Sequence, residues 1–166
     1  NPAIRLGENV KMAYLSQMHG EVFDEKATVL KNFEDAGFDT DDQVIAYLKT
    51  YGFEKELIYS SVCDLSGGEK NLLQLAKISR TGAGLLLLDE PTSHLDTYSQ
   101  LALEQAVEKY NGTVLMVSHD FYTVANCMDY VLLTEDKGLR KVSMRKFRKM
   151  IYADHFDKDY LEYEQK

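Results

Sequence analysis

The sequence of 166 residues predicts an α/β fold with a mostly parallel sheet and a small helical subdomain. Residues 85–88 are four consecutive leucines, which suit a strand that is buried on both faces of a parallel sheet. Residues 113–117 form a second apolar run, which we interpret as another buried strand. Between these runs, Leu103, Ala106, Val107 and Tyr110 recur at helical spacing, so a helix over this stretch would pack on the sheet.

The earlier part of the chain supplies the first strand and the helical subdomain. Residues 10–15 read as a strand, and Gln17 at its end could hold a metal, or a water on the metal, through its amide oxygen. Helical spacing over 26–33 and 44–51 predicts two helices, the second of which begins with a capping-box pattern at Thr40 and Gln43.

A helix that begins at Ser66 is predicted by the pattern Ser-x-x-Glu, in which Ser66 and Glu69 form a capping box. The free N–H groups and positive dipole end of such a helix start make it a ready anion site. Gly67 and Gly68 would let a phosphate approach the backbone closely. An ordinary capped helix without a ligand is the alternative interpretation of the same four residues, 66–69. A similar capping box at Thr97 and Gln100 predicts the start of the next helix.

Two carboxylates, Asp89 and Glu90, follow the leucine strand at once, and Pro91 ends the strand because it has no N–H for the ladder. Ligands of open α/β sheets bind just outside the carboxyl ends of the strands. Asp89 there is a good Mg²⁺ ligand, and Glu90 is a candidate base for activating water. A buried strand that runs into an acidic turn is the simpler alternative.

The strand over 113–117 ends at Ser118-His119-Asp120. Adjacent residues cannot face one another as a hydrolase triad does, so we exclude that chemistry. His119 at a strand end is better suited to donate a hydrogen bond to a phosphate or to an attacking water.

The C-terminal part predicts a hairpin, with strands over 128–134 and 139–142, and then a helix over 144–152. It also holds the one basic cluster of the chain, which is either a solvated face or a contact for RNA phosphates. The cluster consists of Arg140, Lys141, Arg145, Lys146, Arg148 and Lys149.

Composition excludes several function classes. The formal net charge of −8 argues against nucleic-acid binding by bulk electrostatics. The two cysteines, Cys63 and Cys127, form no Cys-x-x-Cys pair and fit core thiols in a reducing cytosol. No apolar run reaches 18 residues, so a transmembrane helix is not expected.

Taken together, these motifs resemble those of the ATP-binding-cassette (ABC) ATPases, in the order that the family has them. Gln17 matches the Q-loop, Leu65–Glu69 the signature sequence, Leu85–Glu90 Walker B, Ser93–Asp96 the D-loop and His119 the switch histidine.

Three details of these motifs resemble the motif sequences of the ABC-F subfamily. These are soluble twin-cassette proteins that act on ribosomes and include antibiotic-resistance factors. The three details are Glu69-Lys70 after the double glycine, His94 before Leu95-Asp96, and the Ser-His-Asp-Phe-Tyr run that ends at Tyr122. Ser93 departs from the asparagine that is commoner at this position in the ABC-F subfamily.

The family also needs a Walker A loop, yet no Gly-Lys dipeptide occurs in this chain. The resemblance therefore implies the C-terminal part of a truncated cassette, most like the second one, that is inactive alone. We expect a core remnant with the Q-loop (1–17), a helical subdomain (18–64), the ATPase core (65–143) and a helical tail (144–166).

The resemblance implies a cytoplasmic ATPase that uses ATP and Mg²⁺. Implied catalytic residues are Glu90 and His119, and implied metal ligands are Asp89 and Gln17. The implied nucleotide-binding residues, several of which complete a partner's site, are Gln17, Ser66, Gly67, Gly68, Glu69 and Asp96.

Expected partners are a second ABC cassette and the ribosome or its RNA. We also expect self-association, since truncation would leave the Leu85 and Val114 strands without neighbours on one side. Two alternatives stay open: the ATPase subunit of a membrane transporter, whose membrane partner is a separate chain, and a catalytically silent interaction module.

Overall fold

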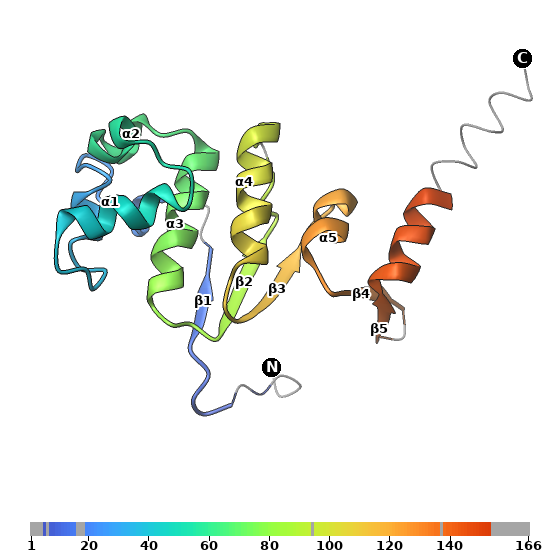
Figure 1. Cartoon of the computed structure of the whole chain (residues 1–166). Helices are drawn as coiled ribbons and strands as arrows, with labels where there is room; N and C mark the ends of the chain where they lie inside the picture. The colour runs from blue at the N-terminus through green and yellow to red at the C-terminus, as the bar shows by residue number, and fades with distance from the viewer. Residues whose placement is uncertain (1–4, 6, 16–18, 94, 137, 154–166) are drawn as a thin grey trace, which may run out of the picture. The chain divides into compact units, whose positions relative to one another are not determined.

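The computed structural model describes residues 5, 7–15, 19–93, 95–136 and 138–153 (Figure 1). It divides into two compact units, Asn1–Ser118 and His119–Lys166. No helix among the described residues is long and apolar enough to cross a membrane.

A parallel sheet of three strands forms the centre of the first unit, as the sequence predicts. The strands β1 (Met12–Tyr14), β2 (Leu85–Asp89) and β3 (Thr113–Val117) lie in the order β1-β2-β3. The leucine strand is therefore central, with Leu86 opposite both Ala13 and Val114. The expectation that it has a free edge is wrong, because the short strand β1 pairs with it. Within the described sheet, β3 is an outer strand, as expected.

The two faces of this sheet differ sharply in exposure. Leu86 and Leu88 point to one face and are 0% and 2% exposed. The alternate residues, which the parallel register places in rows on the other face, are far more open to solvent. Tyr14 and Leu115 flank Leu87 in one such row and are 51% and 50% exposed. A parallel sheet normally has both faces covered, so this face is unusual for its strand type.

The helices of the first unit are α1 (Asp41–Lys49), α2 (Lys55–Tyr59), α3 (Gly67–Arg80) and α4 (Thr97–Glu108). Short 3₁₀ turns lie at His19–Glu21, Lys31–Phe33 and Val62–Asp64. α1 begins at Thr40, whose hydroxyl accepts a hydrogen bond from the Gln43 N–H. The Gln43 side chain accepts from the Asp39 N–H instead of returning to Thr40, so only half of the predicted box forms.

The predicted helix over 26–33 is wrong. The Val29 and Leu30 N–H groups donate to the carbonyls of Ser60 and Ile58, which withdraws them from helical bonding. The Asn32 amide holds the turn by donating to the Asp24 and Thr28 carbonyls. Val29 and Phe33 are nevertheless fully buried, so the apolar spacing correctly indicated burial. They share a core with α1, α2 and α3.

The second unit consists of α5 (Phe121–Cys127), the antiparallel hairpin of β4 (Tyr130–Glu135) and β5 (Gly138–Ser143), and a helix over 144–153. The hairpin and the last helix agree with the sequence prediction. Ala125, Val142 and Phe147 form the small buried core of this unit.

Candidate functional site

Asp89 and Glu90 lie at the carboxyl end of the central strand. Asp89 is the last residue of β2 and is exposed, and the Glu90 N–H donates to the Val117 carbonyl over 2.8 Å. Glu90 has a φ of 47°, in the left-handed region that a non-glycine residue enters at an energetic cost. The chain thus turns sharply at the proposed base while its backbone stays tied to β3.

The start of α3 contacts both the turn after Glu90 and the start of α4. The Asn71 side-chain amide of α3 donates to the Pro91 carbonyl over 3.3 Å. A Cβ built at Gly68 would lie 2.5 Å from the Ser99 Cβ, so α3 and α4 approach closely at this point. The structure therefore brings the predicted signature, Walker B and D-loop segments together. Asn71 and Ser99 carry these contacts and were missed in the sequence, since neither lies at a predicted motif position.

The predicted capping box at Ser66 and Glu69 is confirmed. The Glu69 N–H donates to Ser66 Oγ over 3.2 Å, and the Ser66 N–H donates to Glu69 Oε2 over 2.7 Å. The Glu69 carboxylate thus holds the Ser66 backbone. A Cβ at Gly67 would meet no atom within 4 Å, so close packing does not explain the glycine there. The open space in front of Gly67 fits the predicted approach of a phosphate.

Asp96, rather than the predicted Thr97, is the N-cap of α4. Asp96 Oδ1 accepts from the N–H groups of Tyr98 and Ser99, and Oδ2 accepts from the Ser99 hydroxyl over 2.7 Å. The hydrogen bond from the Ser99 side chain is the main reason that the pKa of Asp96 lies below its ordinary value. Aspartate is a better cap than threonine, which explains why the helix starts one residue earlier.

His119 and Gln17 are the two predicted site residues that lie outside the described part of the first unit. His119 is exposed and begins the second unit, and the next residue, Asp120, caps α5. The Asp120 carboxylate accepts hydrogen bonds from the Tyr122 N–H and the Thr123 N–H and hydroxyl. Gln17 lies outside the described residues, so its predicted role as a ligand stays a prediction.

The donor set at the β2 end fits a nucleotide-bound Mg²⁺. Mg²⁺ at such sites takes one or two carboxylates together with phosphate oxygens and water. Asp89 and Glu90 supply two adjacent carboxylates at the end of β2. The residues present therefore suit a metal that shares its ligands with a phosphate.

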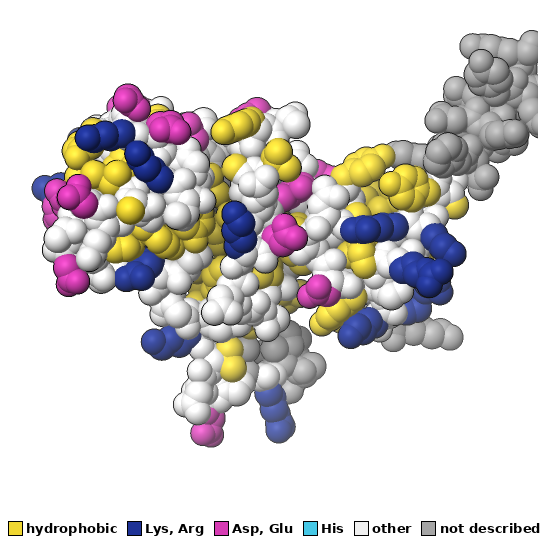
Figure 2. All heavy atoms as spheres, in the orientation of Figure 1, with side chains coloured by type: hydrophobic (Ala, Val, Ile, Leu, Met, Phe, Trp, Pro, Cys, Tyr) yellow, Lys and Arg dark blue, Asp and Glu magenta, His cyan; other side chains and the backbone are white. Residues whose placement is uncertain are grey.

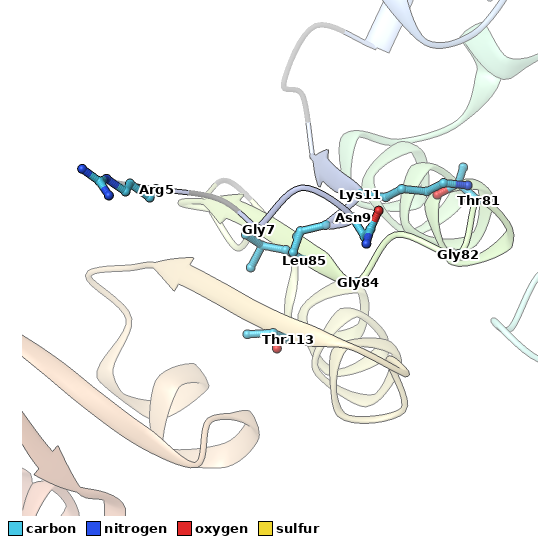
Figure 3. Close-up of a pocket in the computed structure, with 10 residues that line it drawn as sticks. Arg5, Gly7, Asn9, Lys11, Thr81, Gly82, Gly84, Leu85 and Thr113 are labelled. Atoms are coloured by element: carbon cyan, nitrogen blue, oxygen red, sulfur yellow. The ribbon is translucent and has the colours of Figure 1, made fainter. Parts of the chain in front are cut away.

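A cavity of about 650 Å³ lies at the opposite end of the strands (Figure 3). Leu85 and Thr113, the first residues of β2 and β3, line it, together with Arg5 and Lys11. No carboxylate is among the residues that line it. Since ligands of parallel sheets bind at the carboxyl ends, we do not assign the chemistry to this cavity.

The chain is similar to known proteins of one family. The family model described as "ABC transporter" matches residues 5–93. The chain is 41% identical over 133 residues to ABC transporter F family member 5 of Arabidopsis thaliana, covering 79% of this chain and 19% of that protein. It is 37% identical over 140 residues to ATP-binding protein Uup of Haemophilus influenzae, covering 81% of this chain and 22% of that protein. The chain thus spans about a fifth of the length of these curated relatives.

Two solved structures share the fold. One is a dimeric ATP-binding cassette in a post-hydrolysis state with ADP and Pi, with a TM-score of 0.63 at 20% identity. This match covers 81% of this chain and 63% of the other chain. The other is an archaeal ribosome recycling factor in complex with a ribosomal stalk protein, with a TM-score of 0.63 at 26% identity. That match covers 90% of this chain and 31% of the other.

Proposed function

Because the chain belongs to the ABC transporter family and its curated relatives include F family members, we propose that it forms part of an ATP-hydrolysing cassette of an ABC-F protein that acts on the ribosome. The family uses ATP with Mg²⁺. The observation that carries the proposal is the meeting of three motif segments at the carboxyl end of β2. Gly68 packs on Ser99, and Asn71 donates to the Pro91 carbonyl next to Glu90.

We assign the chemistry of ATP hydrolysis to the end of β2. Asp89 would hold the Mg²⁺ that ATP brings, with Gln17 assisting. Glu90, whose position is fixed by its backbone bond to Val117, would orient or deprotonate the attacking water. His119 would donate a hydrogen bond to the γ-phosphate and stabilise the charge that develops on it.

The start of α3 would complete the site of a second cassette. Gly67 is open to an incoming phosphate, and Ser66 and Gly68 flank it. Glu69 would act by holding Ser66, because its carboxylate accepts the Ser66 N–H. Asp96 would couple the two sites across the interface between cassettes. The dimeric state of the related cassette with ADP and Pi supports this pairing.

We also propose that these 166 residues do not hydrolyse ATP by themselves. Their sequence holds no Gly-Lys dipeptide and hence no Walker A loop, which supplies the main phosphate cradle. The exposed row of Tyr14, Leu87 and Leu115 would be covered either by the remainder of the protein or by a second copy of the chain. Light scattering of the isolated chain distinguishes a monomer from such a dimer.

The ribosome is proposed as the partner on two grounds. The curated relatives include F family members, and a ribosome recycling factor shares the fold at 26% identity. The expected behaviour is ATP-dependent co-sedimentation of the intact protein with ribosomes. Association that is the same with ATP, with ADP and without nucleotide would contradict an ATP-driven role there.

The decisive experiment is Glu90→Gln in the intact protein that contains this chain. Removing the base while keeping the shape should leave ATP binding and abolish turnover, so that an ATP-bound closed state accumulates on ribosomes. Glu108→Gln, at the exposed end of α4, changes the same charge away from the site and should turn over normally. Wild-type hydrolysis by Glu90→Gln would refute the assigned role.

A further inference from the structure

The charge of this chain is unevenly distributed. Residues 1–118 carry 18 Asp and Glu against 10 Lys and Arg, and residues 154–166 carry five Asp and Glu against two Lys. Residues 138–153, in contrast, hold six Lys and Arg and no Asp or Glu. A short basic surface inside an acidic chain attracts anions locally, although the net charge of −8 repels them overall.

The helix over 144–153 turns its apolar side inward and its cations outward. Met144, Phe147 and Ile151 are spaced as one helical face and belong to the core of the second unit. Arg145, Lys146 and Lys149 are all exposed on the remaining surface. Figure 2 shows this gathering of Lys and Arg side chains on the second unit.

Three other cations of the cluster already have structural contacts. Arg148 donates to the Ala125 carbonyl over 2.6 Å, and Arg140 pairs with Glu135. The Lys141 ammonium lies 3.8 Å from the centre of the Tyr130 ring. These contacts support the hairpin and helix, so we leave their cations out of the ligand surface.

We propose that the outer face of the helix over 144–153, with Arg145, Lys146 and Lys149, binds the phosphate backbone of RNA; this deepens, and rests on, the ribosomal function proposed above. Arg145 and Lys149 are one helical turn apart, about 6 Å along the axis. Phosphates follow one another about every 3.4 Å along one strand of a duplex, so the face spans roughly two of them.

An anionic membrane surface fits this helix less well than RNA. A helix that binds a bilayer buries its apolar face in the lipid interface. Here Phe147 is 5% exposed, and the apolar side that it shares with Met144 and Ile151 is used by the core of its own unit. Met150 and Tyr152 of this helix stay exposed, but the three cations outnumber them, which suits the sugar-phosphate backbone better than a lipid interface.

The test compares two triple variants of the 166-residue chain. Arg145→Gln/Lys146→Gln/Lys149→Gln removes the proposed contacts, and glutamine keeps a helix propensity close to that of Lys and Arg. Lys31→Gln/Lys49→Gln/Lys55→Gln removes the same charge from exposed positions of the first unit. Fluorescence anisotropy of a fluorescein-labelled single-stranded RNA is measured from about 50 to 200 mM salt, with circular dichroism confirming that both variants fold.

The helix variant should bind RNA more weakly, and its log–log salt slope should be smaller by about 1.4, since the face spans roughly two phosphates and each single-strand phosphate contact contributes about 0.7. The control variant should keep the wild-type slope. An unchanged slope in the helix variant, an equal loss in the control, or tighter binding of the chain to anionic phospholipid vesicles than to RNA would each overturn the proposal.

Failure of this surface and failure of the proposed function give different results. If the Glu90→Gln protein traps ATP on ribosomes but the helix variant binds RNA normally, only the RNA surface is wrong. If Glu90→Gln hydrolyses ATP normally while RNA binding depends on the helix, the ATPase assignment is wrong and the surface stands.

Discussion

Gly68→Ala should destabilise the first unit, whereas Gly67→Ala, one residue earlier in the same helix, should not. The new Cβ at position 68 would lie 2.5 Å from the Cβ and 2.6 Å from the Oγ of Ser99, well inside the 3.5–4.0 Å of an ordinary contact. Ser99 cannot swing away, because its hydroxyl and N–H are both bonded to Asp96. The clash must therefore be relieved by moving α3 against α4.

The magnitude follows from two opposing terms. Overpacking costs about 1–3 kcal/mol, and alanine regains at most about 1 kcal/mol of helix propensity over glycine. With the full propensity gain, Gly68→Ala should thus lose about 0–2 kcal/mol, with about 1 kcal/mol at the centre of this range, while Gly67→Ala, with no atom within 4 Å of its Cβ, should lose nothing. For a chain of this length the two variants should then differ in Tm by several degrees, about 2–4 °C for each kcal/mol.

Urea unfolding followed by circular dichroism measures this difference directly, and Ser99→Gly supplies the internal check. Ser99→Gly should destabilise the wild type, since it removes a capping partner, but should partly restore Gly68→Ala by removing the clashing atoms. Equal unfolding midpoints for Gly67→Ala and Gly68→Ala, or the lack of any rescue, would refute the close contact between the two helix starts.

Three further predictions concern the same site. Glu90→Gly should be more stable to urea than Glu90→Ala by about 1 kcal/mol, because only glycine accepts a φ of 47° without strain; equal midpoints would contradict the strained turn. Ser66→Ala should cost about 1 kcal/mol in thermal unfolding through the lost cap of α3, and Ser66→Thr should cost much less. The pKa of Asp96 is lowered in the folded state, so its charge stabilises the fold above the ordinary value near 3.8 and this contribution is lost as the pH falls through the lower, folded value. The stability advantage of the wild type over Asp96→Asn should therefore shrink between pH 7 and pH 3, and an advantage that grows on acidification would show that the sign is wrong.

Local patterns predicted much of the fold. The strand Thr113–Val117 has the bounds that its apolar run indicates, because Gly112 and Ser118 flank it with polar, turn-forming residues. The hairpin of β4 and β5 follows in the same way from the turn at Gly138, whose φ is 132°. These elements could be predicted because their signals and their partners lie within a few residues of one another.

Structure that depends on contacts between residues far apart in the sequence could not be predicted from local patterns. The segment that contains Val29 does not form the predicted helix, because its N–H groups donate to the carbonyls of Ser60 and Ile58, about 30 residues later in the chain. The strand order was likewise hidden, since β1 and β2 are separated by the whole helical subdomain. Apolar spacing indicates which residues are buried, but it does not indicate which carbonyl group accepts the hydrogen bond of each backbone N–H.

The candidate site likewise has some features that depend on local sequence and others that depend on long-range contacts. Ser66, Asp96 and Asp120 each cap a helix by accepting N–H groups from residues two or three positions on, so their local geometry depends on a handful of neighbouring letters. The starts of α3 and α4 could therefore be predicted within a residue, whereas the start of α5 at Asp120 was not predicted. The close approach of Gly68 to Ser99 has no such local signal, since it needs two caps from distant segments to meet. The two glycines at the start of α3 are thus indistinguishable in the sequence but differ in their surroundings. Gly68 is required by its close packing on Ser99, whereas Gly67 faces open space, which is where we propose that a phosphate binds.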